Sequence, residues 1–270
     1  MCESQYQIAL IGSSGMLAKM VRERAPQNYR LHLYDLPEFD VTDRDQVLQE
    51  MRQVQPEIII NCAAYTDVDG CETEVELANR VNGTAVGYLA DAARKADATL
   101  VHISTDYLFD GRKEAPYSEE DRVNPQSAYG RSKLLGEQAI LDSGLKKFFI
   151  VRTSWLYGPG GKNFVETILR LAGEREELRI VADQVGSPTY TADLADAIFH
   201  LLALTADRSP ITGYNPYGTY HFSDEGHCSW HEFACAIVAE ARSHNLPVVT
   251  GEILPIRTDE YPLPAQRPAN

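Results

Sequence analysis

Tyr129 and Lys133 stand four residues apart in the stretch AYGRSKLLGE, and no other of the fourteen tyrosines has a lysine four positions on. Residues at this spacing share one face of a helix, so the phenol and the ammonium group are expected to be neighbours. A free phenol has a pKa of about 10, and a lysine cation beside it lowers that pKa. The pair predicts a general acid/base for a carbonyl or an alcohol. A surface pair on an amphipathic helix is the alternative, because two residues are a weak pattern.

A glycine turn near the N-terminus predicts a dinucleotide site. The apolar run 8–11 passes into Gly12-x-x-Gly15-x-x-Ala18, and a helical pattern follows. Gly12 allows a tight turn, Gly15 lets the backbone approach a pyrophosphate, and Ala18 is small enough for the helix to pack on the strand. The helix N-terminus would then face the phosphates with its partial positive charge. The alternative is an ordinary strand-to-helix turn.

A second strand is expected at residues 31–34, and it ends at Asp35. An acid at this place accepts hydrogen bonds from the ribose hydroxyls and repels a 2′-phosphate, which favours NADH slightly over NADPH. An ordinary turn aspartate is the alternative. Further on, Thr42 with Asp45 three residues later resembles a helix start.

Two later strand ends are expected to complete the site. In VHISTDYLFDG, Ser104 and Thr105 carry hydroxyls where a carbonyl could be polarised, although either could instead cap the turn. In NCAAYTDVDGCE, the small residues Ala63 and Ala64 would let a cofactor lie close to the backbone.

The composition is that of a soluble enzyme. The 270 residues are 44% hydrophobic and 24% charged, and they carry a net charge of −14. So acidic a chain argues against non-specific binding to nucleic acid or to an anionic membrane. No segment is apolar and long enough to span a bilayer, and MCESQYQ lacks the features of a signal peptide. Five cysteines without a C-x-x-C pair favour a reducing cytoplasm.

Strand and helix patterns alternate along the chain. Strands are expected at residues 7–12, 30–35, 57–63, 99–104 and 148–153, and helices at 17–24, 43–54, 75–95 and 127–142. This order predicts an α/β fold, a Rossmann-type doubly wound parallel sheet with a smaller C-terminal substrate-binding lobe. We expect a dinucleotide-binding domain at residues 1–155, completed by about 190–225, and the smaller lobe at 156–189 and 226–270. Ligands of such sheets gather at the carboxyl ends of the strands.

The stretch GHCSWHEFAC holds residue types that zinc takes, at His227, Cys228, His231 and Cys235. However, Ser229 and Glu232 have the spacing of a capping box. A stripe expected in the core follows, formed by Trp230, Phe233 and Ile237. No metal site is predicted, because no second ligand pair has matching spacing.

The chain resembles the extended short-chain dehydrogenase/reductase superfamily, and within it the dTDP-4-dehydrorhamnose reductase family. Nearly the whole chain carries the matching stretches, which are GSSGML, NCAAYTDVD, VHISTDYLFDG, PQSAYGRSKLLGE, RTSWLYG, KNFVETILRLA, VADQVGSPTYTADLA and DEYPLPAQRPAN. The resemblance implies reduction of the C4 ketone of a nucleotide-linked 6-deoxyhexulose by NADH or NADPH. It also implies that Thr105 hydrogen-bonds the ketone oxygen, that Tyr129 protonates it, and that Lys133 lowers the Tyr129 pKa and binds the nicotinamide ribose.

The resemblance implies further contacts, carried over position by position. Residues expected to hold the cofactor, besides Tyr129 and Lys133, are Gly12, Ser14, Gly15, Met16, Leu17, Asp35, Asp40, Val41, Ala63, Ala64 and Tyr65. Residues expected to face the sugar are Thr105, Asp106 and Trp155. An asparagine like Asn82 supports such sites through the backbone and a water. For Asn163, Gln184 and Arg267, a place near the nucleotide and a packing role both stay open.

Two departures from the family pattern bear on assembly and length. Some relatives are dimers bridged by Mg²⁺ through a glutamate in the first helix, where this chain has Met20, and Mg²⁺ demands oxygen ligands. We therefore expect a monomer or weak homodimer without a metal bridge. Relatives also continue through another helix after a motif like the one that ends at Asn270, so a trimmed sequence and a missing helix both stay open.

Two other functions are compatible with the same fold. One is a non-catalytic, dinucleotide-binding regulatory subunit of the kind that a relative forms with methionine adenosyltransferase. The other is a nucleotide-sugar epimerase or dehydratase. The presence of Thr105, Tyr129 and Lys133 favours an enzyme over the first. Dehydratases want a pair of acids near the threonine, and this chain offers only Asp106 there.

Overall fold

The computed structural model describes residues 6–206 and 215–269. Six parallel strands form its central sheet, in the order β10-β5-β4-β3-β1-β2. Their bounds are β1 Tyr6–Ile11, β2 Tyr29–Tyr34, β3 Ile58–Asn61, β4 Thr99–Thr105, β5 Phe148–Thr153 and β10 Gly218–His221. The predicted Rossmann-type parallel sheet is confirmed. Residues 1–5 of the N-terminal stretch MCESQYQ, which include Cys2, and Asn270 lie outside the described residues.

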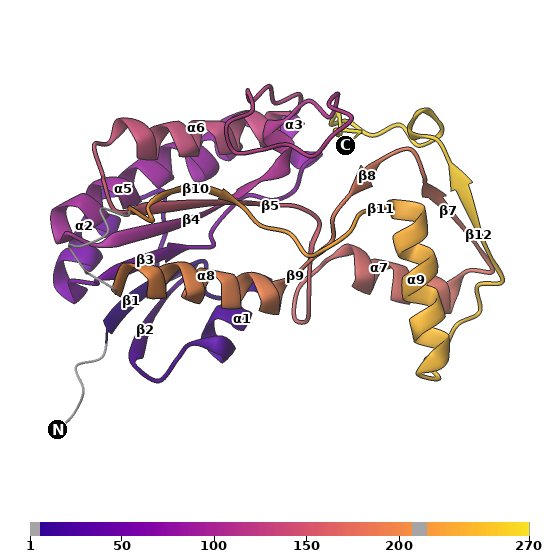
Figure 1. Ribbon diagram of the computed structural model, residues 1–270, viewed down its shortest axis with the longest axis horizontal. Coiled ribbons are helices and arrows are strands. Elements are labelled where there is room, and N and C mark those ends of the chain that lie inside the picture. The colour runs from indigo at the N-terminus through magenta and orange to yellow at the C-terminus, as the bar shows by residue number, and fades with distance from the viewer. Residues whose placement is uncertain (1–5, 207–214, 270) are drawn as a thin grey trace.

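Helices cover both faces of this sheet (Figure 1). One face carries α1 Met16–Arg24 and α8 Thr191–Ala206, and the other carries α2 Arg44–Val54, α5 Ala85–Ala96 and α6 Ala128–Asp142. Side chains alternate along β1, so Ile8 and Leu10 join the core with α1 and α8. Ala9 and Ile11 join the core with α2 and α5. Burial on both faces explains why the strand sequence is continuously apolar.

The strand order reverses beside β1, which pairs with β2 on one side and β3 on the other. The chain runs outward from β1 to β2 and then crosses back to β3. A reversal of this kind opens a crevice at the carboxyl ends of the strands, where ligands of open α/β sheets bind.

The helix expected at residues 43–54 has a different cap from the predicted one. Asp43 is the N-cap of α2, and its carboxylate accepts hydrogen bonds from the amides of Asp45 and Gln46, each at 3.0 Å. The Thr42 hydroxyl instead donates to Asp40 at 2.8 Å. The prediction that Thr42 begins the helix is wrong, because a carboxylate one residue later satisfies two amides at once.

The single helix expected at residues 75–95 is interrupted. The structure has α4 Val75–Asn79, a π-helical turn η1 Arg80–Thr84, and α5 Ala85–Ala96. A short helix, α3 Gly70–Thr73, precedes them. A π-turn inserts one residue and often marks a functional position. Here it contains the buried Asn82.

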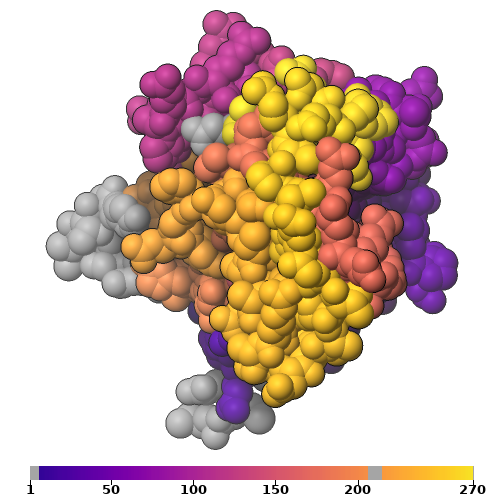
Figure 2. Space-filling view, turned by 90° about the vertical axis from the view of Figure 1, so that its right-hand side faces the viewer, coloured from indigo at the N-terminus to yellow at the C-terminus, as the bar shows by residue number. Residues whose placement is uncertain are grey.

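A smaller group of elements packs at the end of the molecule opposite α2 and α5 (Figure 1). It contains α7 Phe164–Glu174, α9 Trp230–Ser243 and the parallel strands β7 Glu177–Val181 and β12 Glu252–Ile256. These elements share a separate apolar cluster that includes Ile168, Leu178 and Ile237. Figure 2 shows this end, whose centre is formed largely by the last part of the chain.

Short elements join the two groups. They are β6 Leu156–Tyr157, β8 Val185–Gly186, β9 Thr189–Tyr190 and β11 Cys228–Ser229, with the 3₁₀ turns η2 Asp106–Leu108 and η3 Thr258–Glu260. β6 pairs with β9, and β8 pairs with β11. Among the residues that the structure describes, every helix is too short or too polar to span a lipid bilayer.

Candidate active site

A cavity of about 710 Å³ opens at the carboxyl ends of the central strands. Elements from the whole length of the chain line it, from the glycine turn to the start of α9. Its lining includes Ser14, Gly15, Met16, Leu17, Ala64, Ser104, Thr105, Asp106, Tyr129, Lys133, Trp155, Lys162, Phe164 and Trp230. Most of the sequence-predicted site residues therefore meet in one place.

Thr105, Tyr129 and Lys133 converge on this cavity from two elements. Thr105 is the last residue of β4, and Tyr129 is the second residue of α6. Ser127 begins that helix as its N-cap by accepting a hydrogen bond from the Gly130 amide at 3.1 Å. Lys133 follows Tyr129 by about one turn, as the four-residue spacing predicts. The Thr105 hydroxyl is hydrogen-bonded to the Tyr129 phenol.

The Tyr129 phenol is less acidic than the sequence led us to expect. Burial raises its pKa above the ordinary value, and the hydrogen bond with Thr105 offsets this rise only in part. The nearby Asp106 carboxyl raises it further. The expectation of a lowered pKa for Tyr129 is therefore contradicted, because burial is the largest influence on this phenol. At neutral pH the phenol keeps its proton.

Lys133 is a buried cation with a fixed direction. Its side chain is 1% exposed, and its ammonium donates a hydrogen bond to the Ile103 carbonyl at 2.7 Å. Burial lowers the pKa of Lys133 to about 8, although the Glu137 carboxylate opposes this shift. The amine is thus charged at neutral pH, but it loses its proton far more readily than a surface lysine.

Asn82 connects the loop after β3 to α6. Its amide oxygen accepts from the Tyr65 amide at 2.8 Å, and its nitrogen donates to the Tyr65 carbonyl at 3.0 Å and to the Ser132 hydroxyl at 3.0 Å. The Ser132 hydroxyl donates in turn to the Tyr129 carbonyl at 2.8 Å. The π-turn aims Asn82 inward, and the side chain supports the Tyr129 backbone from below.

Asp106 lies where two cavities meet. Its carboxylate accepts a hydrogen bond from the Thr105 hydroxyl at 3.0 Å. Burial raises the pKa of Asp106 to about 6, although this hydrogen bond opposes the shift. Asp106, Thr153 and Ser154 line both the 710 Å³ cavity and a neighbouring one of about 810 Å³.

The glycine turn is tight and lies close to the end of β3. Gly12 has a φ of 74°, and a Cβ there would lie 2.6 Å from the Ala63 nitrogen. The Gly15 amide donates to the Gly12 carbonyl at 3.1 Å, and α1 begins at Met16. Only glycine fits at position 12, because a larger residue would have an unfavourable φ and its Cβ would collide with the Ala63 backbone. The free amides of the α1 N-terminus point a partial positive charge at this edge of the sheet.

The other predicted cofactor residues divide into two groups. The Asp35 carboxylate accepts from the Ser14 amide at 2.6 Å and lines a smaller cavity of about 430 Å³ beside the turn. Asp40 accepts a hydrogen bond from the Thr42 amide, and Val41 packs against the core. Neither residue is part of the lining of the 710 Å³ or the 430 Å³ cavity. The Tyr65 phenol donates a hydrogen bond to the Glu74 carboxylate at 2.5 Å, so only the backbone of Tyr65 lies near the glycine turn.

The family profile described as RmlD substrate binding domain matches residues 6–270. The chain belongs to this family. A dTDP-4-dehydrorhamnose reductase of Burkholderia thailandensis is 46% identical over 235 residues, which cover 86% of this chain and 78% of the relative. The spore coat polysaccharide biosynthesis protein SpsK of Bacillus subtilis is 40% identical over 264 residues, which cover 97% of this chain and 87% of the relative.

A solved structure agrees with this assignment. The crystal structure of dTDP-4-dehydrorhamnose reductase from Bacillus anthracis, in complex with NADP, matches with a TM-score of 0.89 and 41% identity, covering 98% of this chain and 89% of that one. The family, the fold and the oxidoreductase class expected from the sequence are confirmed.

Trp155 and Trp230 occupy a place that sequence reasoning foresaw only in part. Trp155 lines the 710 Å³ cavity, and its predicted contact with the sugar stays a prediction. Trp230 was expected in the core with Phe233 and Ile237, but it is half-buried and lines the same cavity. Its ring stacks on Trp155 with 3.4 Å between centroids and 7° between planes. Spacing along α9 alone could not show a partner 75 positions earlier in the chain.

The weaker candidates near the nucleotide have visible packing partners. Asn163 is the N-cap of α7, and its side chain donates to the carbonyls of Gly158 and Gly161 at 2.8 and 2.9 Å. Arg267 makes a two-pronged ion pair with Asp69 at 2.8 and 3.1 Å. Gln184 donates to Thr258 at 3.1 Å. Gln184 and Arg267 also line a further cavity of about 740 Å³, which shares Phe164 and Trp230 with the first.

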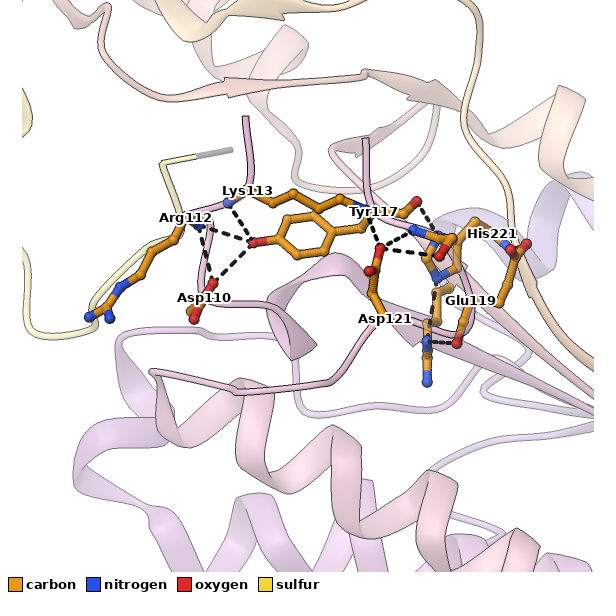
Figure 3. A network of polar contacts seen from close by, with 9 residues as sticks. Asp110, Arg112, Lys113, Tyr117, Glu119, Asp121 and His221 are labelled. Carbon is orange, nitrogen blue, oxygen red and sulfur yellow. Dashed lines mark hydrogen bonds and ion pairs between the residues drawn. The ribbon is translucent and has the colours of Figure 1, made fainter. Parts of the chain in front are cut away.

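A polar network shapes the loop that leads into α6 (Figure 3). The Tyr117 phenol accepts from the amides of Arg112 and Lys113 at 3.0 and 3.1 Å, and it donates to Asp110 at 3.0 Å. The Glu119 carboxylate accepts from the His221 amide on β10 at 2.9 Å. This network fastens the loop to the edge of the sheet and walls the 810 Å³ cavity. This network was not predicted from the sequence, because its residues form no short motif.

The side chains predicted around the start of α9 contact neighbouring residues of the smaller group of elements. Ser229 and Glu232 form the predicted capping box, with the Glu232 amide donating to the Ser229 hydroxyl at 3.1 Å. His231 contacts the Ile253 carbonyl at 3.0 Å. Across residues 6–206 and 215–269, no group of three or more His, Cys, Asp or Glu side chains could hold a metal ion. Met20 is 6% exposed and packs in the core beside the sheet.

Proposed function

We propose that this protein reduces the C4 ketone of dTDP-4-dehydro-L-rhamnose, or of a similar nucleotide-linked deoxyketosugar, to dTDP-L-rhamnose with NADH or NADPH. The observation that carries the proposal is the meeting of Thr105, Tyr129 and Lys133 in one cavity next to the glycine turn. The relatives that share most of the chain bear the name of this reductase.

The residues present fit a dinucleotide. A Cβ at Gly12 would collide with Ala63, so the backbone of the glycine turn lies directly against the segment that follows β3. The N-terminus of α1 offers amides for a pyrophosphate, and the small side chain of Ala64 leaves space for a ligand in the cavity. Gly12, Gly15 and Met16 would hold the phosphates, and Lys133 would hold the nicotinamide ribose. When bound, reduced nicotinamide supplies the hydride.

The catalytic side chains are arranged to stabilise charge on the ketone oxygen. Hydride addition at C4 places negative charge on that oxygen, and donors aimed at it lower the barrier. We assign this role to the hydroxyls of Thr105 and Tyr129, which are hydrogen-bonded to each other. Because burial raises its pKa, Tyr129 is protonated at working pH and transfers its proton to the much more basic alkoxide. The Lys133 cation then stabilises the phenolate that remains.

The nucleotide is assigned to the 740 Å³ cavity. This cavity adjoins the catalytic one through Phe164 and Trp230, and its wall carries the cations Arg175 and Arg179. Aromatic rings and arginines suit a base and a diphosphate. The elements that form it, α7, β7 and the segment after β12, belong to the part of the chain that we propose as the substrate-binding lobe, residues 156–189 and 226–270.

NADH is proposed as the slightly favoured cofactor. The Asp35 carboxylate lies at the end of β2 and faces the glycine turn through the Ser14 amide at 2.6 Å. A negative charge there suits free ribose hydroxyls and opposes a 2′-phosphate. The protein is proposed to act in the cytoplasm as a monomer or a weak homodimer without a metal bridge.

A dehydratase is less compatible with the cavity than a reductase. Among the described residues that line the 710 Å³ cavity, Asp106 is the only carboxylate. Elimination of water from a sugar needs an acid and a base besides the tyrosine, and the lining provides one such group.

An absorbance assay at the nicotinamide band tests the proposal. Enzymatically made dTDP-4-dehydro-L-rhamnose is mixed with the protein and with NADH or NADPH in turn. We expect oxidation of the cofactor in step with formation of dTDP-L-rhamnose. If folded protein oxidised neither cofactor, the reductase would be excluded. Binding of a dinucleotide without turnover would instead favour the regulatory subunit.

A further inference from the structure

The two tryptophans of this chain form one stacked pair. The sequence has two tryptophans, Trp155 and Trp230, and their rings lie 3.4 Å apart between centroids with 7° between their planes. Trp155 follows β5, whereas Trp230 begins α9. The pair therefore joins the end of the central sheet to the smaller group of elements.

Trp155 is held by an unusual backbone conformation and by a glycine that lies against its ring. Trp155 has a φ of 44°, in the left-handed region that residues other than glycine rarely adopt. Its carbonyl accepts a hydrogen bond from the Thr189 amide at 3.2 Å. Gly186 lies directly against the ring, since a Cβ there would be 2.5 Å from the Trp155 Cε2 atom. A strained conformation of this kind persists only where its surroundings enforce it.

One small antiparallel sheet positions both Gly186 and Trp230 beside the Trp155 ring. β8 pairs with β11, with Gly186 opposite Cys228 and Val185 opposite Ser229. Trp230 follows directly on Ser229, whose capping box with Glu232 fixes the first turn of α9. The β8–β11 ladder thus contains Gly186, which makes room for the Trp155 ring, and leads directly into Trp230, which covers the face of that ring.

Trp230 stands between the two cavities that the proposed substrate would occupy. Phe164 and Trp230 are the described residues that line both the 710 Å³ and the 740 Å³ cavities. The Phe164 ring is tilted against Trp230 with 4.5 Å between centroids. A nucleotide sugar with its base on one side and its sugar on the other must pass this pair of rings.

We propose that Trp230 is a positioning residue for substrate recognition: it holds the Trp155 indole in the wall of the catalytic cavity, and the stacked pair sets the affinity for the sugar-bearing substrate. This inference rests on the proposed function and deepens it. The role is separate from dinucleotide binding, because the glycine turn and Asp35 lie on other elements.

The first test separates substrate affinity from cofactor affinity in Trp230→Leu. Aromatic pairing contributes about 0.5–1.5 kcal/mol, so we expect KM for dTDP-4-dehydro-L-rhamnose to rise roughly threefold to tenfold. We expect kcat and the Kd for NADH, measured by nicotinamide fluorescence, to stay unchanged. Trp230→Phe keeps an aromatic ring and should restore most of the affinity. Phe233→Leu is the matched control, since Phe233 packs on Phe164 from the same helix without lining either cavity.

The second test asks whether Trp230 acts through Trp155. In a Trp155→Leu background, adding Trp230→Leu should leave KM where Trp155→Leu alone put it, because the two residues act as a unit. Additive effects on KM would overturn the inference. So would an unchanged KM in an active Trp230→Leu enzyme, or a KM rise of the same size in Phe233→Leu. Wild-type protein is assayed first: absence of turnover there overturns the proposed function, whereas the other outcomes bear on Trp230 alone.

Discussion

The Lys133 ammonium donates a hydrogen bond to the Ile103 carbonyl at 2.7 Å, from a side chain that is 1% exposed. β4 thereby holds the cation of α6 in place at the floor of the cavity. A cation in so dry a position acts strongly on whatever charge forms nearby. Its own pKa falls to about 8 for the same reason.

The pH dependence of the reaction should therefore report Lys133. Because its pKa in the folded protein is about 8, the ammonium is charged below that pH and neutral above it. We expect kcat/KM to fall as the pH rises through about 8. Lys133→Met should lower kcat/KM at pH 7 by roughly a hundredfold, the usual effect of losing one group that stabilises the transition state, and should lack the fall. Lys162→Met, which removes an exposed lysine from the same cavity, should keep it. A fall that persisted in Lys133→Met would assign it to another group.

Gly12→Ala should remove dinucleotide binding for a steric reason that a second glycine can isolate. Gly12 and Gly144 have φ values of 74° and 77°, but a Cβ meets Ala63 at 2.6 Å at position 12 and nothing within 4 Å at position 144. Either alanine should cost about 1–2 kcal/mol of conformational strain. Only Gly12→Ala should also weaken NADH binding, measured by nicotinamide fluorescence alongside urea unfolding. Equal NADH affinity in the two variants would contradict a close approach at the turn.

Cofactor preference should depend on Asp35. Asp35→Ala removes the charge that opposes a 2′-phosphate, so the ratio of kcat/KM with NADPH to kcat/KM with NADH should rise. Asp45→Ala removes an equal charge from the first turn of α2 and controls for the overall field. The ratio is measured with one substrate preparation for all three proteins. An unchanged ratio in Asp35→Ala would show that this carboxylate does not face the ribose.

Two neighbouring aspartates should change stability in opposite directions with pH. Burial raises the pKa of Asp106 from 3.8 to about 6, so the folded state binds more protons than the unfolded state in that window. Its contribution to stability is therefore lost as the pH rises from about 4 to 6. Asp106→Asn should raise Tm above pH 6, and the gain should vanish below pH 4. Hydrogen bonds lower the pKa of Asp110, led by that from Asn124, so Asp110→Asn should lower Tm at neutral pH. The same sign for both variants would contradict this account.

Local patterns anticipated those parts of the site that depend on neighbours in sequence. β5 was expected at 148–153 and spans Phe148–Thr153, because its apolar run is bounded by polar residues on both sides. The spacing of Tyr129 and Lys133 placed both on one face of α6. Gly12 was assigned to a tight turn, and its φ of 74° agrees.

Other parts depend on contacts between distant segments. The π-turn at Asn82 is stabilised by the Tyr65 backbone and by Ser132, 50 positions later, which helical periodicity cannot reveal. The pattern of α9 alone predicts Trp230 to be a core residue. Its place in the cavity lining follows from its stacking on Trp155, which is distant in sequence. The Tyr129 pKa follows the depth of burial, which no spacing expresses.

The central claim is that Tyr129 gives its proton to the sugar ketone, and Tyr129→Phe tests it most directly. The substitution removes one oxygen and leaves the ring, which packs edge-on against Tyr107 with 5.6 Å between centroids. In the nicotinamide absorbance assay at pH 7 we predict that kcat falls at least about a hundredfold, the usual scale of general acid catalysis, while the Kd for NADH stays the same. Turnover equal to that of the wild type would contradict the account.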